Sequence, residues 1–275
     1  MSQIMAPWRR SFFINLLAMV GAVVLLQACG GGGNKAAAAP VVNADPTGYY
    51  DITGTASVKD DATNRNPVPI TDLQGMVYNN HLYMISSLTG LTYDGPISVN
   101  GTGFTSNVTI YSKGVKVTTA SIIGMIDAGK TITGSLTGTG SGNGSFALNY
   151  AVNNKAQSTL AIAGHSGVAW NGKISWSNFS TNFTIDGTTG SITSSGGSKP
   201  VFLGCVVTGT VAPLNGTHLY TINATVSSCF DSSSTGANGT YTGLATTRTQ
   251  SVEDDTLVMI ITDGNSAYSM DGELK

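Results

Sequence analysis

Charged side chains are scarce in this 275-residue chain, and glutamate is almost missing from it. Charged residues make up 10% of the sequence, and Glu253 and Glu273 are its two glutamates. Helical surfaces usually draw on Glu, Lys, Ala and Leu, so this composition disfavours a helical protein. The 13 Lys and Arg residues, set against 15 Asp and Glu, form no basic stripe, which argues against a nucleic acid partner.

Histidine is also rare, which limits the catalytic chemistry that the chain can support. The three histidines are His81, His165 and His218, and no two of them have the spacing of metal ligands. The segment Gly164-His165-Ser166 resembles the start of a nucleophile elbow, but Val168 stands where that motif needs glycine. We therefore expect a protein that is not an enzyme, with no catalytic residues, no cofactor and no metal.

One loop carries several oxygen ligands of the kind that calcium binds. Asp60–Asn66 contains aspartate, threonine and asparagine, but it lacks the glycine at loop position six and the closing glutamate of an EF-hand. We interpret it as a solvated loop, with a calcium site as the alternative.

Long apolar runs are absent except near the start of the chain. Arg9 and Arg10 precede the apolar run Phe12–Leu26, which is shorter than the roughly 20 residues of a membrane-spanning helix. A basic segment, an apolar segment and small residues before a cleavage point are typical of a signal peptide. We assign residues 1–28 to that signal.

The end of this signal, Leu26-Gln27-Ala28-Cys29, resembles the lipobox of bacterial lipoproteins. The resemblance implies cleavage before Cys29, attachment of lipid (palmitate and related acyl chains) to its sulfur, and acylation of the new amino group. Several acyl chains hold a protein firmly on a bilayer. The alternative is an ordinary secretory signal in which the cysteine stands by chance.

The residues around the signal also bear on where the protein goes. Gly30, and not aspartate, follows Cys29, and by the same resemblance this implies sorting to the outer membrane, facing either the periplasm or the cell surface. Arg9-Arg10 also resembles a twin-arginine export motif, although the strongly apolar run favours the general secretory route. Residues 29–47 have low complexity and are predicted to be the lipidated cysteine and a flexible tether.

The other two cysteines, Cys205 and Cys229, belong to a chain that is bound for an oxidising compartment. We predict that they form a disulfide. The alternative, a metal site with two cysteine ligands, lacks nearby histidines, because His218 alone lies between them.

From Gly48 onward, short alternating runs are separated by turn dipeptides. Val108–Tyr111 and Val115–Val117, for example, flank Ser112-Lys113-Gly114. Asn-Gly and Asp-Gly supply the positive φ of tight hairpins. They recur at Asp94-Gly95, Asn100-Gly101, Asn171-Gly172, Asn215-Gly216, Asp263-Gly264 and Asp271-Gly272. The pattern predicts an all-β fold, in which antiparallel meanders and hairpins form two small β-barrel or β-sandwich domains.

One segment departs from this pattern near the middle of the chain. Lys155–Ala163 contains no glycine or proline and is predicted to form a short helix near the junction of the two domains. We place the N-terminal β domain at 48–152, and the C-terminal β domain, with the disulfide, at 153–275.

The C-terminal half has a recognisable layout. It contains Gly204-Cys205, a strand centred on Tyr220, the second cysteine, Cys229, and Gly239-Thr-Tyr-Thr-Gly-Leu-Ala245. It resembles a group of bacterial lipoproteins and exported proteins that share these features. The resemblance implies an architecture and carries no activity.

Four aromatic residues form the densest aromatic patch of the sequence: Trp170, Trp176, Phe179 and Phe183. They could line a ligand pocket, as in small barrels that carry apolar molecules, or fill the core. We expect these four side chains to fill the core. The first functional hypothesis is therefore a lipid-anchored β protein of the cell envelope. Its role would be structural, adhesive or surface-binding, with an envelope or host-surface partner. The alternative is a lipocalin-like carrier of a small apolar ligand.

Overall fold

The computed structural model describes residues 40–59, 67–112, 114–151, 170–174, 180–186, 188–194, 206–228, 238–249 and 255–274. Within them the predicted all-β fold is confirmed, because the strands pair antiparallel and the one helical element is a 3-10 turn, η1 (Gly140–Gly142). No helix in this described part has the length and apolar character needed to cross a bilayer. The helix predicted at Lys155–Ala163 and the domain boundary at 152–153 lie outside the described residues.

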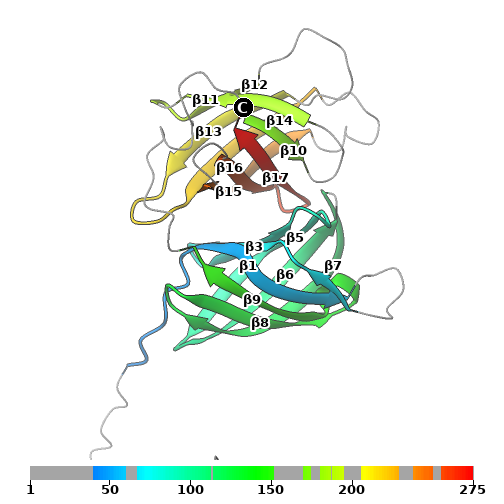
Figure 1. The fold of residues 1–275 in the computed structure, drawn as a ribbon, viewed down its shortest axis with the longest axis vertical. Helices are drawn as coiled ribbons and strands as arrows, with labels where there is room; N and C mark the ends of the chain where they lie inside the picture. The colour runs from blue at the N-terminus through cyan, green and yellow to red at the C-terminus, as the bar shows by residue number, and fades with distance from the viewer. Residues whose placement is uncertain are drawn as a thin grey trace, which may run out of the picture. The chain divides into compact units, whose positions relative to one another are not determined.

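The first half of the chain closes into an eight-stranded ring, which we call barrel 1 (Figure 1). Its strands are β1 (Gly48–Lys59), β2 (Pro67–Ile70), β3 (Leu73–Tyr78), β4 (His81–Ser86), β5 (Leu91–Asn100), β6 (Gly103–Ser112), β7 (Gly114–Asp127), β8 (Thr131–Gly138) and β9 (Gly144–Tyr150). From β3 to β9 each strand pairs with the next, and β1 pairs with both β9 and β3. The short β2 continues the line of β3 along the far end of β1, so it adds no further position to the ring.

The second half closes in the same way into barrel 2, which also has eight strands (Figure 1). They are β10 (Trp170–Ile174), β11 (Ser180–Ile185), β12 (Ser191–Ser194), β13 (Val206–Pro213), β14 (Tyr220–Ser227), β15 (Gly239–Thr249), β16 (Asp255–Thr262) and β17 (Ser266–Leu274). Each pairs with its neighbour in sequence, and β10 pairs with β17. Residues Val41–Lys275 form one compact unit.

Alternation along the strands fills the interior of barrel 1 with apolar side chains. The bulky members, each at most 4% exposed, include Tyr50, Tyr93, Phe104 and Phe146. The turn η1 is buried at this core, and its Ser141 carbonyl accepts a hydrogen bond of 3.1 Å from the Tyr93 hydroxyl. The interior of barrel 1 is therefore occupied by side chains of the protein itself.

Barrel 2 has a separate core of the same kind. Its described members are Ile185, Ile192, Val207, Val211, Tyr220, Ile222, Ala224, Val226, Tyr241, Ala245, Leu257, Met259, Ile261 and Tyr268. Burial raises the pKa values of Tyr220 and Tyr241, so their phenols stay protonated across the physiological range.

Three dipeptides predicted as turns are wrong, since they lie inside strands. They are Asp94-Gly95 in β5, Asn171-Gly172 in β10 and Asp271-Gly272 in β17. At Gly95 the cause is the close approach of a neighbouring strand: a Cβ atom there would overlap the Asn107 carbonyl oxygen and lie 2.9 Å from Val108 Cα. Glycine at this position lets a barrel strand kink. An Asp-Gly pair in a kinked strand cannot be told from an Asp-Gly pair in a hairpin turn by its sequence. Asn100-Gly101, Asn215-Gly216 and Asp263-Gly264 do lie in turns.

A third apolar cluster, which we call the interbarrel wall, joins the two barrels. Its members are Tyr49, Met76, Tyr83, Ile85, Leu219, Leu244, Val258 and Ile260, each 9% exposed or less. On β16, Val258 and Ile260 belong to this wall, while Leu257, Met259 and Ile261 belong to the core of barrel 2. Because successive strand residues point to opposite faces, the outer face of β16 is buried against barrel 1.

Candidate functional site

Most residues singled out from the sequence lie outside the described residues. This holds for Cys29, Cys205, Cys229, Trp176 and Phe179, and for the segments Asp60–Asn66 and Gly164–Val168. The proposed disulfide is therefore not described. Of the aromatic patch, Trp170 on β10 and Phe183 on β11 are register partners, so the fold brings these two strand positions side by side.

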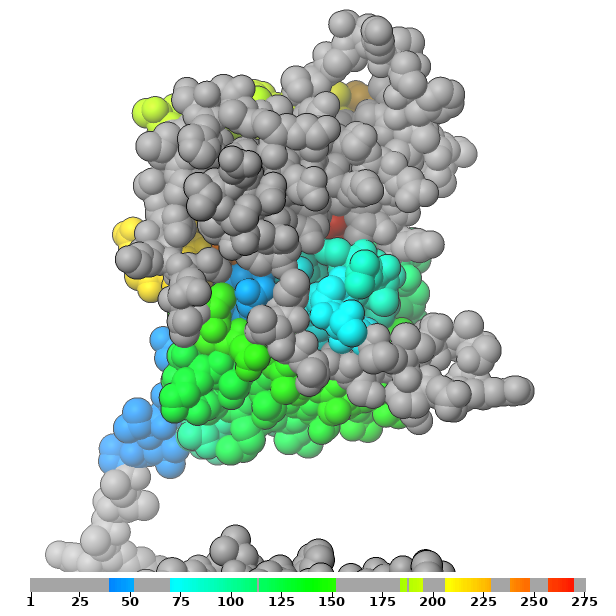
Figure 2. Space-filling model, in the orientation of Figure 1, coloured from blue at the N-terminus to red at the C-terminus, as the bar shows by residue number. Residues whose placement is uncertain are grey.

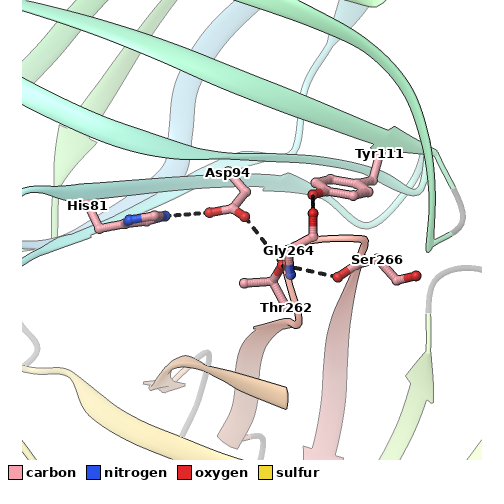
Figure 3. A network of polar contacts seen from close by, with 6 residues as sticks. All are labelled: His81, Asp94, Tyr111, Thr262, Gly264 and Ser266. Atoms are coloured by element: carbon pink, nitrogen blue, oxygen red, sulfur yellow. Dashed lines mark hydrogen bonds and ion pairs between the residues drawn. The ribbon is translucent and has the colours of Figure 1, made fainter. Parts of the chain in front are cut away.

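The structure gathers polar side chains at a place that the sequence did not single out, where strands of barrel 1 meet β16 and the turn that follows it (Figure 3). The cluster, which we call the polar seam, comprises His81, Asp94, Tyr111, Thr262, Gly264 and Ser266. The first three come from β4, β5 and β6 of barrel 1, and the others from β16, β17 and the turn between them. The seam thus exists only because the two barrels meet.

A histidine–carboxylate pair begins the seam. The tight turn at Asn79 and Asn80, with φ of 50° and 57°, returns the chain from β3, so that β4 begins at His81. On its other side β4 pairs with β5, which carries Asp94. The His81 Nε2 atom contacts Asp94 Oδ1. The other carboxylate oxygen, Oδ2, accepts a hydrogen bond of 3.3 Å from the Thr262 hydroxyl of barrel 2. Asp94 therefore connects an imidazole of one barrel to a hydroxyl of the other.

Two backbone contacts continue the seam. The Tyr111 hydroxyl donates a 3.0 Å hydrogen bond to the Gly264 carbonyl, and β7 pairs with β17 at Val115 and Gly114. A Cβ atom at Gly114 (φ +82°) would overlap the Tyr268 ring, so glycine is required for this approach. The turn between β16 and β17 is thereby held against barrel 1.

Burial controls the electrostatics of the seam. The Asp94 side chain is 10% exposed and that of His81 is 37% exposed, and the His81 ring lies against the Tyr83 ring at a tilt of 35°, with centroids 4.5 Å apart. Desolvation, and then the charge of Asp94, raise the pKa of Tyr83 to about 12. The same two causes raise the pKa of Tyr111. Both phenols therefore stay protonated at neutral pH and do not act as bases.

The seam has part of a catalytic arrangement and lacks the rest. A histidine–aspartate pair acts in acyl transfer when the other ring nitrogen faces a nucleophile. Among the described residues, no hydroxyl or thiol hydrogen-bonds to Nδ1 of His81. Nor does any group of three or more His, Cys, Asp or Glu in this part of the chain suit a metal ion. The geometry best suits a structural role, in which the hydrogen bonds of the seam hold the two barrels together.

A second polar contact lies elsewhere along the interbarrel wall. His218, on the connection between β13 and β14, places Nε2 3.1 Å from the hydroxyl of Tyr150 at the end of β9. The His218 carbonyl accepts a 2.9 Å hydrogen bond from Thr246. Its Nδ1 atom is buried and has no hydrogen-bond partner within the described part of the chain, and desolvation lowers the pKa of His218.

This lowered pKa predicts a pH dependence of stability. Between the folded pKa and the unfolded value of about 6.5, the unfolded chain binds a proton that the folded chain does not. The contribution of His218 to stability is therefore complete above that window and is lost as the pH falls through it. We expect the free energy of unfolding, measured by urea titration, to decrease from pH 7.5 to pH 5, and the decrease to be smaller in His218→Gln. An equal decrease in both proteins would contradict this assignment.

Sequence reasoning passed over the seam because its residues are far apart along the chain. Asp94 and Thr262 are separated by 168 positions. Asp94-Gly95 has the sequence of a turn, and three histidines along a chain of this length do not by themselves indicate a site. One signal was available, since Leu82–Ile85 and Leu257–Ile261 are continuous apolar runs, which are typical of strands buried on both faces.

Comparisons with known proteins add little. No protein-family model matches the chain, and no curated protein matches it. Among solved structures, the chain is similar to immune modulator A of Aeromonas veronii, with 13% identity and a TM-score of 0.36. The match covers 85% of this chain and 96% of that one. A likeness at this level supports no argument about function.

Proposed function

We propose that this chain is a lipid-anchored β protein of the bacterial cell envelope, with a non-catalytic structural, adhesive or surface-binding role. The observation that carries the proposal is that most of the described buried groups, both apolar and polar, are bound to one another within the protein. The interior of barrel 1 is filled, and the polar groups of the seam bind one another across the two barrels. Outside the interbarrel wall, the outer faces of strands such as β6 and β8 remain exposed and available for partners.

The outer wall of barrel 1 supports this role through its chemistry. Along β6 and β8 it exposes hydroxyl and amide side chains, namely Thr105, Asn107, Thr133, Ser135 and Thr137. A surface of this kind offers hydrogen bonds without charge, which suits neutral partners of the envelope or of a host surface.

The experiment compares the wild type with Cys29→Ala in a bacterial host. The wild type should incorporate labelled palmitate and fractionate with the outer membrane, whereas Cys29→Ala should do neither. Protease treatment of intact cells then reports whether the barrels face outward. If the Cys29→Ala protein still fractionates with membranes, or if the wild type takes up no palmitate, the anchor is wrong.

One observation favours the second candidate, a carrier of a small apolar ligand. Ser106 on β6 is 5% exposed, and its hydroxyl has no hydrogen-bond partner among the described residues. An unpaired buried hydroxyl is costly unless something satisfies it, and a small ligand that displaces core side chains next to Ser106 could do so. Native mass spectrometry of the purified protein distinguishes the candidates, because a carrier should retain a small molecule that denaturation releases.

A further inference from the structure

Of the seven large apolar side chains that are exposed among the described residues, four lie at one end of barrel 1. Val41, Val42, Ile123 and Met125 are 66%, 86%, 71% and 55% exposed, and we call them the tether-side patch. On β7, Met125 is the register partner of Gly103 and Ile123 that of Thr105, so both lie near the start of β6. Exposed apolar groups gathered in one region are typical of a surface that meets another apolar phase.

The chain enters the barrel at this same end. The turn at Gly101 holds the entering segment through two hydrogen bonds: its carbonyl accepts from Ala44 N at 2.7 Å, and its N–H donates to Asn43 Oδ1 at 2.9 Å. The Tyr50 hydroxyl donates to the Pro46 carbonyl at 2.8 Å. In Figures 1 and 2 this segment, coloured blue, is seen at the edge of barrel 1.

The distance to the proposed anchor is short. Cys29 and Pro40 are 11 positions apart, so the chain between them reaches at most about 40 Å when fully extended. A flexible chain of that length averages about 18 Å between its ends. A lipid on Cys29 would therefore keep the bilayer closer to this end of barrel 1 than to the opposite end.

The charges near the patch do not oppose contact with lipid. The register neighbours of Ile123 are Thr105 and Ser135, which are uncharged. The nearby turn between β7 and β8 carries Asp127 and Lys130, whose charged atoms lie 3.2 Å apart and offset each other. The carboxylate of Asp45 accepts a hydrogen bond from Thr47 N. Contact would therefore depend on apolar burial and not on the charge of the headgroups.

We propose that the tether-side patch rests in the interfacial region of the phospholipid bilayer that holds Cys29. The inference depends on the proposed lipid anchor and adds an orientation to it. A few partly inserted side chains bind a membrane weakly by themselves. Tethering by the anchor supplies the high local concentration that makes such a weak contact persistent.

The test places a tryptophan on the patch and another at the opposite end of the barrel. The mature lipidated protein is reconstituted into phosphatidylethanolamine–phosphatidylglycerol vesicles, with or without brominated acyl chains. Ile123→Trp reports on the patch. Leu88→Trp is the matched control, because Leu88 is 77% exposed and lies in the turn between β4 and β5. Emission is measured as the difference from the unsubstituted protein, and Met125→Trp replaces Ile123→Trp if that variant misfolds.

The expected result is a blue-shifted emission for Ile123→Trp that bromine reduces about twofold, since interfacial side chains insert 5–10 Å into the headgroup–acyl boundary. The emission of Leu88→Trp should be unaffected. Unquenched emission from vesicle-bound Ile123→Trp overturns the orientation and leaves the anchor intact. A blue shift without quenching means that a second protein copy covers the patch, which also overturns it. Protein that does not float with the vesicles overturns the anchor and the orientation together.

Discussion

Replacing Ile260 by aspartate should destabilise the folded protein by more than about 4 kcal/mol, because the substitution places an unpaired carboxylate in the interbarrel wall. Ile260 is fully buried on the outer face of β16, in the same cluster as Met76 and Tyr83 of barrel 1. Loss of its apolar contacts adds to the cost of burying the charge. Urea denaturation of the purified mature protein measures the effect.

The control for this variant is Ile123→Asp. Ile123 also lies on the outer face of a strand, but it is 71% exposed, so the change should alter stability by no more than about 0.5 kcal/mol. Equal effects of the two substitutions would mean that the wall does not hold the barrels together. A transition that splits in two for Ile260→Asp would instead show barrel 1 remaining folded after barrel 2 has unfolded.

Replacing Gly243 by alanine should cost about 3 kcal/mol, as expected when extra volume forces a backbone to shift. Gly243 is the register partner of Ile222 on β14 and Ile261 on β16, so strands flank it on both sides. A Cβ atom there would overlap the Ile260 carbonyl oxygen and lie 2.8 Å from its carbon. These are backbone atoms, which cannot rotate away as a side chain could. The urea midpoint at unchanged slope reports the loss.

Gly103→Ala is the matched control for the strand glycine. A Cβ atom at Gly103 would have the Asn100 carbonyl oxygen as its nearest neighbour, at 3.5 Å, an ordinary van der Waals contact. This alanine should be nearly neutral, or slightly stabilising through the unfolded chain. If Gly103→Ala cost as much as Gly243→Ala, the steric explanation would be wrong.

Local patterns were sufficient to predict the fold class. Alternation such as Val108–Tyr111 and the turn at Asn100-Gly101 reflect interactions between near neighbours, which the sequence contains directly. The same local patterns do not show whether the strands close into two barrels or form β-sandwiches. It depends on β1 pairing with β9 and β10 with β17, across separations that no local pattern records.

The seam was beyond prediction for a related physical reason. The carboxylate of Asp94 and the hydroxyl of Thr262 meet because two barrels pack together, and each residue alone looks like an exposed polar group on a strand. Gly95 shows the same limit, since one residue type serves both a hairpin turn and the close approach of strands. The continuous apolar runs Leu82–Ile85 and Leu257–Ile261 are the sequence feature that indicates strands buried on both faces, as they are at the interface.

The double burial of β16 has a consequence for the order of folding. Leu257–Ile261 is an uncharged run rich in β-branched and large apolar residues, of the kind that self-associates when exposed. It comes late in the chain, after all the strands that form barrel 1. Since a chain is synthesised from its N-terminus, barrel 1 can already be present when this run appears. Barrel 1 would then already present the apolar surface of Met76, Tyr83 and Ile85 that covers the outer face of β16.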